Sequence, residues 1–114
     1  MNDLEQRLFQ FAIRTIKYLR TLPNSEEFKV IRYQLTKSCS SSGANYEEAQ
    51  AGSSKADFNN KTRISLREMR ESNYWLRVIM ALAQADTPEL DILLKESAEL
   101  KNILGSIVQK TRTK

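Results

Sequence analysis

Residues 34–76 read QLTKSCSSSGANYEEAQAGSSKADFNNKTRISLREMRESNYWL, and this stretch predicts two helices joined by a short turn. Small residues come first, Gly52 follows, and Ser54 with Asp57 has the spacing of a helix N-cap and its partner. If the turn lies near Gly52, antiparallel pairing places Ser41 opposite Ser65. Heptad spacing then marks the second helix, at Phe58, Thr62, Ser65, Met69, Ser72, Leu76, Ile79 and Ala83.

The serine-rich run at residues 38–44 admits two interpretations. Serine and glycine cost about 0.5–1 kcal/mol each in a helix relative to alanine, so composition alone allows a flexible loop. A helix is the alternative, because serine hydroxyls can bond back to the carbonyl four residues earlier. We favour the helix, since the flanking residues keep helical spacing without a phase break and Gly52 is a better stop signal than Gly43.

The remaining segments predict two further helices. A wide apolar face over residues 3–21 indicates a helix buried on more than one side, and Leu22-Pro23 ends it. Asn24 is the expected N-cap of the next helix, and Thr87-Pro88 starts the last one. We therefore predict one all-α domain over residues 1–114, an antiparallel up-down-up-down four-helix bundle, with helices at about 3–21, 25–51, 54–85 and 88–109.

Composition limits the possible functions. The chain has 114 residues, 40% hydrophobic and 28% charged, and its net charge of +4 permits nucleic-acid contact without demanding it. It contains no histidine, which removes the commonest general base and metal ligand. The single cysteine, Cys39, is expected to be a buried packing residue. Neither a signal peptide nor a membrane span is visible, so we expect a cytoplasmic protein without a membrane partner.

These residues resemble the bacterial four helix bundle proteins, also called the 23S rRNA intervening-sequence protein family. The family pattern is matched without gaps, although Ala49 and Gly43 depart from it. The matching residues are Gln34, Leu35, Lys37, Ser41, Asn45, Glu48, Lys55, Phe58, Ile64, Ser65, Leu66 and Glu71. The resemblance covers nearly the whole chain.

The resemblance implies assembly as a homo-oligomer, a homopentameric ring. It also implies distant similarity to the accessory protein of diversity-generating retroelements, which forms a basic pentamer, contacts nucleic acid and partners a reverse transcriptase. The family has no established enzymatic activity.

A line of arginines is the best functional candidate in the sequence. Steps of four, three and seven place Arg63, Arg67, Arg70 and Arg77 on one helix face, and Arg14 with Lys17 forms a second patch. Arginine suits phosphate because its planar fork can bond two oxygens. The same face could instead pair with acids at a subunit interface or within the helix, as Arg67 with Glu71, or simply be solvated.

Other polar residues predict structural roles. We expect Gln34 or Lys37 to bond Glu71, and Asn45 or Glu48 to bond groups near Lys61. Paired carboxylates can hydrolyse substrates or bind metals, but no Glu-x-x-His motif is present, so the usual di-iron bundle is excluded. The sequence therefore predicts no catalytic residue, no metal site and no cofactor. Tyr46, Tyr74 and Trp75 could stack on bases, although such aromatic residues more often fill cores.

Three functions remain after these observations. The first is a non-enzymatic oligomeric scaffold that binds RNA, DNA or a nucleic-acid-processing protein through its basic faces. The second is a purely structural or protein-interaction assembly module without a nucleic-acid role. The third is an enzyme with a carboxylate site, for which the sequence offers little support.

Overall fold

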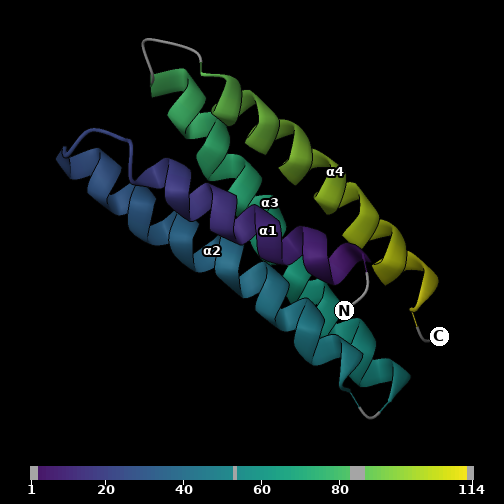
Figure 1. Ribbon diagram of the computed structural model, residues 1–114. Coiled ribbons are helices and arrows are strands. Elements are labelled where there is room, and N and C mark those ends of the chain that lie inside the picture. The colour runs from purple at the N-terminus through teal and green to yellow at the C-terminus, as the bar shows by residue number, and fades with distance from the viewer. Residues whose placement is uncertain (1–2, 53, 83–86, 113–114) are drawn as a thin grey trace.

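The chain folds into four helices packed around one core, as seen in Figure 1. The computed structural model describes residues 3–52, 54–82 and 87–112. Within this part, each helix packs against the next one and α1 also packs against α4, while the diagonal pairs do not touch. This arrangement confirms the all-α, up-down-up-down bundle. The helices are α1 (Asp3–Leu19), α2 (Glu26–Gln50), α3 (Lys55–Leu82) and α4 (Pro88–Lys110).

Side-chain caps start α3 and α4 where the sequence predicts them. The Ser54 hydroxyl accepts a hydrogen bond from the Asp57 amide at 3.1 Å. The Thr87 hydroxyl likewise accepts from the Leu90 amide at 3.2 Å, with Pro88 in the first turn. Both caps satisfy amide groups that have no partner inside the helix.

The cap of α2 is Ser25, and the prediction of Asn24 was wrong. The Ser25 hydroxyl accepts from the Phe28 amide at 3.4 Å. The Asn24 side-chain oxygen instead accepts from the Arg32 guanidinium at 3.5 Å, and Arg32 also donates to the Pro23 carbonyl at 2.9 Å. The side chain of Asn24 is thus engaged with Arg32, two turns into α2, and Ser25 caps the helix one residue later than predicted. Asn2, three residues before Glu5, has the spacing of an N-cap for α1 but lies outside the described residues.

The helix ends differ slightly from the predicted bounds. α1 ends at Leu19 because the Thr21 and Leu22 amides bond to carbonyls only three residues back, at 2.9 and 3.2 Å, which tightens the chain before Pro23. α2 continues through Gly43 to Gln50, so the helix interpretation of the serine-rich run is confirmed. α3 is described to Leu82, and residues 83–85 of the prediction lie outside the described part. α4 reaches Lys110, one residue further than predicted.

Serines join α2 to α3 in the middle of the core. The Ser42 hydroxyl donates to the Ser65 carbonyl at 2.8 Å, and the Ser65 hydroxyl donates to the Ser42 carbonyl at 2.7 Å. The Ser38 hydroxyl, one turn earlier on α2, lies 2.8 Å from the Ser72 hydroxyl, two turns later on α3. Small residues therefore face small residues as predicted, but the residue opposite Ser65 is Ser42, not Ser41. The observed pairing is therefore shifted by one position from the predicted one.

Apolar side chains from all four helices complete this core. Fully buried examples are Leu35, Met69, Leu76, Leu100 and Leu104. Cys39 is also buried, as predicted, and burial raises the pKa of its thiol to about 12. This thiol therefore stays protonated and unreactive near neutral pH. No helix in the described ranges combines the length and apolar character needed to cross a membrane.

One face of α1 is not covered by the other described residues. Leu8, Phe11 and Thr15 are buried, as the wide apolar face of this helix predicts. Burial on more than one side was also expected, yet Phe9, on the neighbouring side of α1, keeps 47% of its surface exposed and Ile13 is only half-buried. The difference arises because only α2 and α4 contact α1. Figure 1 shows that the α2–α3 hairpin also extends beyond the beginning of α1.

Candidate nucleic-acid interface

All four predicted arginines project from α3 into solvent. Arg63, Arg67, Arg70 and Arg77 are exposed, and their positions fall within about 80° of arc around the helix. Within this face, Arg63, Arg70 and Arg77 follow each other at seven-residue steps. They form the edge of α3 nearest to α4, whereas Arg67 points further away from it.

Two buried asparagines hold the outer arginines in place. Asn73 is 7% exposed, its amide nitrogen donates to the Ser97 hydroxyl at 2.8 Å, and its oxygen accepts from Arg77 Nε at 3.0 Å. Asn59, which is 6% exposed, repeats this arrangement two heptads earlier on α3. Its nitrogen donates to the Val108 carbonyl at 3.0 Å, and its oxygen accepts from Arg63 Nε at 2.8 Å. Each asparagine thus links an arginine of α3 to α4.

These side chains border a basic groove between α3 and α4, here called the α3–α4 groove. Its volume is about 490 Å³, and it is lined by Arg70, Asn73, Arg77, Lys101, Asn102 and Gly105. The lining contains three cations and no carboxylate. Within the described part of the chain, none of these three cations is ion-paired. The groove therefore presents unneutralised positive charge to an anionic ligand.

Lys101 and Gly105 of this groove were missed from the sequence. α4 as predicted carries a net negative charge, with two basic and four acidic residues, so it gave no reason to look for a cationic surface. The available signal was the antiparallel register, because Arg70 lies 12 residues before the end of α3 at Leu82 and Lys101 lies 13 residues after the start of α4 at Pro88. Those distances bring the two residues to the same height in the bundle.

Gly105 is expected to reduce stability while keeping the groove open. A Cβ atom built there would meet no atom within 4 Å, and the backbone needs no positive φ. Gly105→Ala should therefore raise the free energy of unfolding by about 0.5–1 kcal/mol, measured by urea denaturation. If nucleic acid approaches the floor of the groove, the same variant should bind it more weakly. A loss of stability would show that the glycine is required by packing.

The remaining arginine, Arg67, pairs with a different acid from the one predicted. Its Nε lies 3.6 Å from the Glu68 carboxylate, and Glu71 instead lines a groove between α2 and α3 with Gln34 and Lys37. The prediction of an Arg67–Glu71 pair was wrong because Glu71 faces toward α2. A different pair within α3 does form, because four-residue spacing brings Lys61 to 3.4 Å from the Asp57 carboxylate.

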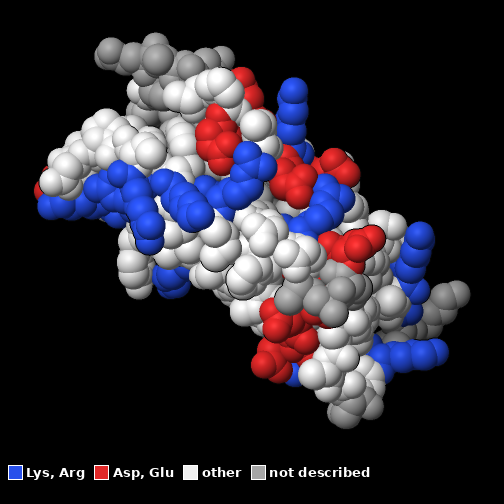
Figure 2. Space-filling model, viewed as in Figure 1, with Lys and Arg blue, Asp and Glu red and all other residues white. Residues whose placement is uncertain are grey.

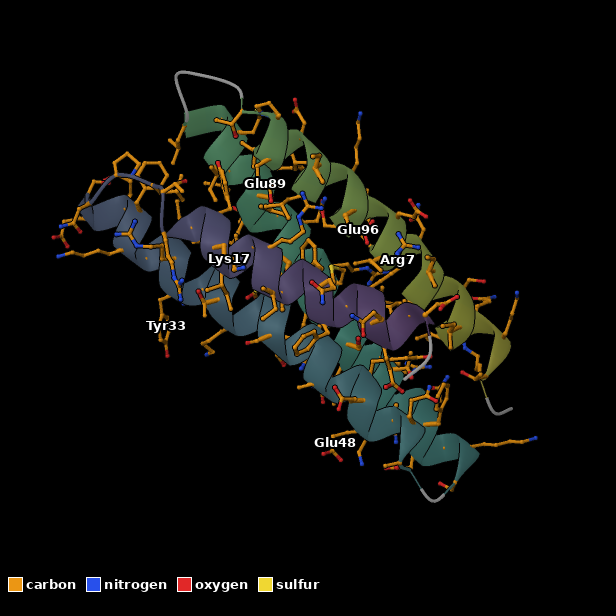
Figure 3. The ribbon with its side chains drawn as sticks, viewed as in Figure 1. Arg7, Lys17, Tyr33, Glu48, Glu89 and Glu96 are labelled. Atoms are coloured by element: carbon orange, nitrogen blue, oxygen red, sulfur yellow. The ribbon has the colours of Figure 1, made fainter. Side chains whose placement is uncertain are left out.

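Arg14 of the second patch is an interhelical clamp. Its guanidinium donates to both oxygens of Glu89 on α4, at 3.2 and 2.8 Å. Two turns earlier on α1, Arg7 binds Glu96 in the same way, at 3.0 and 2.8 Å, as Figure 3 shows. Hydrogen bonds to these carboxylates raise the pKa of both arginines. Glu89 therefore largely neutralises Arg14, and of the predicted patch only Lys17 remains without an ion pair among the described residues.

The distribution of charge differs between the two sides of α4. Figure 2 shows the face formed by α1 and α4, where cationic and anionic side chains lie next to each other. Lys and Arg side chains gather on this view mainly where α1 ends and α2 begins. The α3 side of α4 carries the unpaired cations of the α3–α4 groove. Of the two predicted basic patches, only the arginine line on α3 is organised into a concave basic surface.

The structural polar residues are only partly arranged as predicted. Gln34, Lys37 and Glu71 share the groove between α2 and α3, which brings together the expected partners. Asn45 bonds within its own helix, to the Ser41 carbonyl at 2.8 Å, so its expected contact near Lys61 was wrong. The asparagine amide reaches back one turn more easily than across the helix interface. Glu48 is exposed on α2, as Figure 3 shows.

The described residues offer little catalytic chemistry. Within the described ranges, no three His, Cys, Asp or Glu side chains are grouped so that they could hold a metal ion. Tyr46 is buried against Phe58, with ring centroids 6.4 Å apart, and serves the core. Trp75 is half-buried. Tyr74 is different, because half of its surface is exposed and the Arg77 guanidinium lies 5.7 Å from its ring centre.

Comparisons with known proteins agree with the resemblance seen in the sequence. The family described as 23S rRNA-intervening sequence protein matches residues 2–106. A crystal structure of a protein of unknown function from the S23 ribosomal protein family of Bacteroides thetaiotaomicron superposes with a TM-score of 0.82. It is 30% identical and covers 92% of this chain and 97% of its own. No curated protein matches the sequence significantly. The distant similarity to the accessory protein of diversity-generating retroelements stays a prediction.

Proposed function

We propose that this chain, which belongs to the 23S rRNA-intervening sequence protein family, is a non-enzymatic scaffold. In this proposal the scaffold binds nucleic acid through α3. The α3–α4 groove carries this proposal, since it gathers Arg70, Arg77 and Lys101 without a carboxylate in its lining. Arg63 extends the same edge of α3. The proposal includes a cytoplasmic location and an RNA or DNA ligand, either free or held by a protein partner.

The chemistry of the groove favours the phosphate backbone over base edges. Guanidinium and ammonium groups bind phosphate oxygens through charge-assisted hydrogen bonds, and such contacts are independent of sequence. Each neutralised phosphate releases counterions, so affinity should fall steeply as salt increases. A single groove offers few contacts and would bind weakly. Several copies of the groove in an oligomer would raise the overall affinity by increasing the effective concentration.

Removing two groove arginines should weaken this binding and reduce its salt dependence. In Arg70→Gln/Arg77→Gln, the slope of log K against log salt should fall by about 1.5, because each phosphate contact contributes roughly 0.7–0.9. The matched control is Arg20→Gln/Lys95→Gln, which removes the same charge at two exposed positions outside the groove and away from α3, and should keep most of the slope. Fluorescence anisotropy with a labelled oligonucleotide from about 50 to 200 mM salt measures both. If the two variants lose the same affinity and the same salt dependence, binding depends on net charge alone, which would contradict a localised site.

A second candidate function, the assembly module, is favoured by a shallow apolar groove between α1 and α2. Its volume is about 250 Å³, and Phe9, Ile13 and Ile16 face Gly43 and Ala44 across it. Half of the Phe9 surface is exposed there, and an aromatic side chain in an apolar patch is typical of protein contacts. Under this proposal, copies of the chain assemble through the groove, as the homopentamer implied by the family resemblance. Light scattering at low and high salt measures the assembly.

The two candidates make different predictions for the arginines. If the arginines bind nucleic acid, Arg70→Gln/Arg77→Gln should leave the oligomer intact and weaken binding. If they join subunits, the same variant should dissociate the oligomer. A chain that is monomeric at every salt concentration would contradict the assembly proposal alone.

A further inference from the structure

An exposed tyrosine stands within the arginine face. Tyr74 lies four residues after Arg70 and three before Arg77, so all three share one side of α3. Tyr74 is 50% exposed, and the Arg77 guanidinium lies 5.7 Å from the centre of its ring. The Trp75 ring packs edge-on against it, with the two ring centres 5.2 Å apart. Those two neighbours restrict the ring. An aromatic surface fixed beside phosphate-binding side chains is the combination that binds single strands.

The spacing of the arginines also distinguishes single strands from duplexes. Seven residues of α-helix span about 10.5 Å, so Arg63, Arg70 and Arg77 form a nearly straight row of about 21 Å. A strand of B-DNA winds around the duplex axis with a full turn in about 34–36 Å, so it curves away from a straight row. A flexible single strand can straighten to lie along the whole row, which favours single strands over a rigid duplex.

The asparagine contacts prepare this row for binding. Because Asn59 and Asn73 hold Nε of Arg63 and Arg77, respectively, those guanidinium groups are already oriented before a ligand arrives. Their Nη groups remain as the outward donors. Ordering a long side chain costs conformational entropy, and a preorganised arginine avoids much of that cost.

We propose that the α3–α4 groove and its rim bind single-stranded nucleic acid, with phosphates on Arg70 and Arg77 and a base stacked on Tyr74. The inference rests on the proposed nucleic-acid binding and adds the type of strand. RNA and DNA single strands share this chemistry.

Three ligands of equal length test the inference by fluorescence anisotropy at about 50 mM salt: a single strand of about 12 nucleotides, its duplex, and a strand that lacks all bases. The wild-type chain should bind the complete single strand about tenfold more tightly than either of the other two, because only it offers stacking along a flexible backbone. Running the single strand as RNA and as DNA separates the two sources.

Variants at Tyr74 locate the stacking contact. Tyr74→Leu should weaken binding of the complete strand about tenfold and leave binding of the base-free strand unchanged, while Tyr74→Phe should bind like the wild type. The matched control is Tyr33→Leu. Tyr33 is 61% exposed and has Lys37 5.4 Å from its ring centre, but it lies on α2, so this change should have no effect.

The outcomes separate the inference from the proposed function. If Tyr74→Leu binds all three ligands like the wild type while Arg70→Gln/Arg77→Gln weakens them, backbone binding stands and the stacking inference is overturned. Equal affinity of the wild type for single strand and duplex would also overturn it. If Tyr33→Leu weakens binding as much as Tyr74→Leu, the contact is not at this groove. Absence of binding to any ligand would remove both proposals.

Discussion

Phe11→Ala should lower the free energy of unfolding by about 3–5 kcal/mol. Phe11 is 2% exposed and is among the largest fully buried side chains of the bundle. It belongs to α1, the shortest of the described helices, so fewer other buried residues hold this helix against the bundle. Truncation removes the apolar burial and also leaves a cavity, and a packed core closes such a cavity only in part. Urea denaturation followed by circular dichroism measures the change at constant m.

Phe9→Ala is the control for this experiment. Phe9 lies on the same helix and loses the same atoms, but it is 47% exposed, so the change should cost about 1 kcal/mol or less in the isolated chain. If chains assemble through the α1–α2 groove, the cost of Phe9→Ala should grow with protein concentration. The cost of Phe11→Ala should not depend on concentration. A cost below about 1 kcal/mol for Phe11→Ala would contradict its position in the core.

Ser42→Leu should destabilise the chain by about 3 kcal/mol. Ser42 is fully buried, and its hydroxyl oxygen lies 2.8 Å from the Ser65 carbonyl and 3.2 Å from the Ser65 hydroxyl. Leucine adds three carbon atoms where α3 already occupies the space, and overpacking of this kind costs about 1–3 kcal/mol. The lost buried hydrogen bonds add about 1 kcal/mol. The better helix propensity of leucine offsets less than about 1 kcal/mol.

Two changes calibrate the Ser42 result. Ser40→Leu places the same residue two positions away, where the serine is exposed and bonds back to the Thr36 carbonyl at 2.6 Å. It should be neutral or slightly stabilising. Ser42→Ala removes the hydroxyl without adding volume and should cost about 1 kcal/mol. If Ser42→Leu unfolds at the same urea concentration as the wild type, α2 and α3 cannot be as close as the serine hydrogen bonds require.

The fold follows from local patterns to a large extent. The heptad residues Thr62, Ser65, Met69, Ser72, Leu76 and Ile79 are all buried, as their spacing predicts. The serine-rich run is helical because its hydroxyls find acceptors nearby, in the same helix and across the interface, and this back-bonding was foreseeable. The Asn24 error shows the limit of local patterns. Asparagine and serine cap equally well, and a contact from Arg32 separated them.

The candidate site was predicted only in part. Steps of four, three and seven placed the arginines on one face of α3, and that placement holds. The same rule also proposed Arg14 with Lys17 as a patch, but Arg14 is bound to Glu89, 75 residues away in sequence. Periodicity reports which side of a helix a residue occupies. It does not report which helix faces that side.

The sequence therefore determined the four helices, the stop after α2 and most of the residues facing the core, because these depend on spacing within a few turns. Only the tertiary structure decided how the charges divide. Packing placed the glutamates of α4 against Arg7 and Arg14 of α1, and turned Lys101 and Gly105 of the same helix toward α3. Coulomb interactions act through space, so the neighbour across a groove sets whether a cation is neutralised or remains available to a ligand.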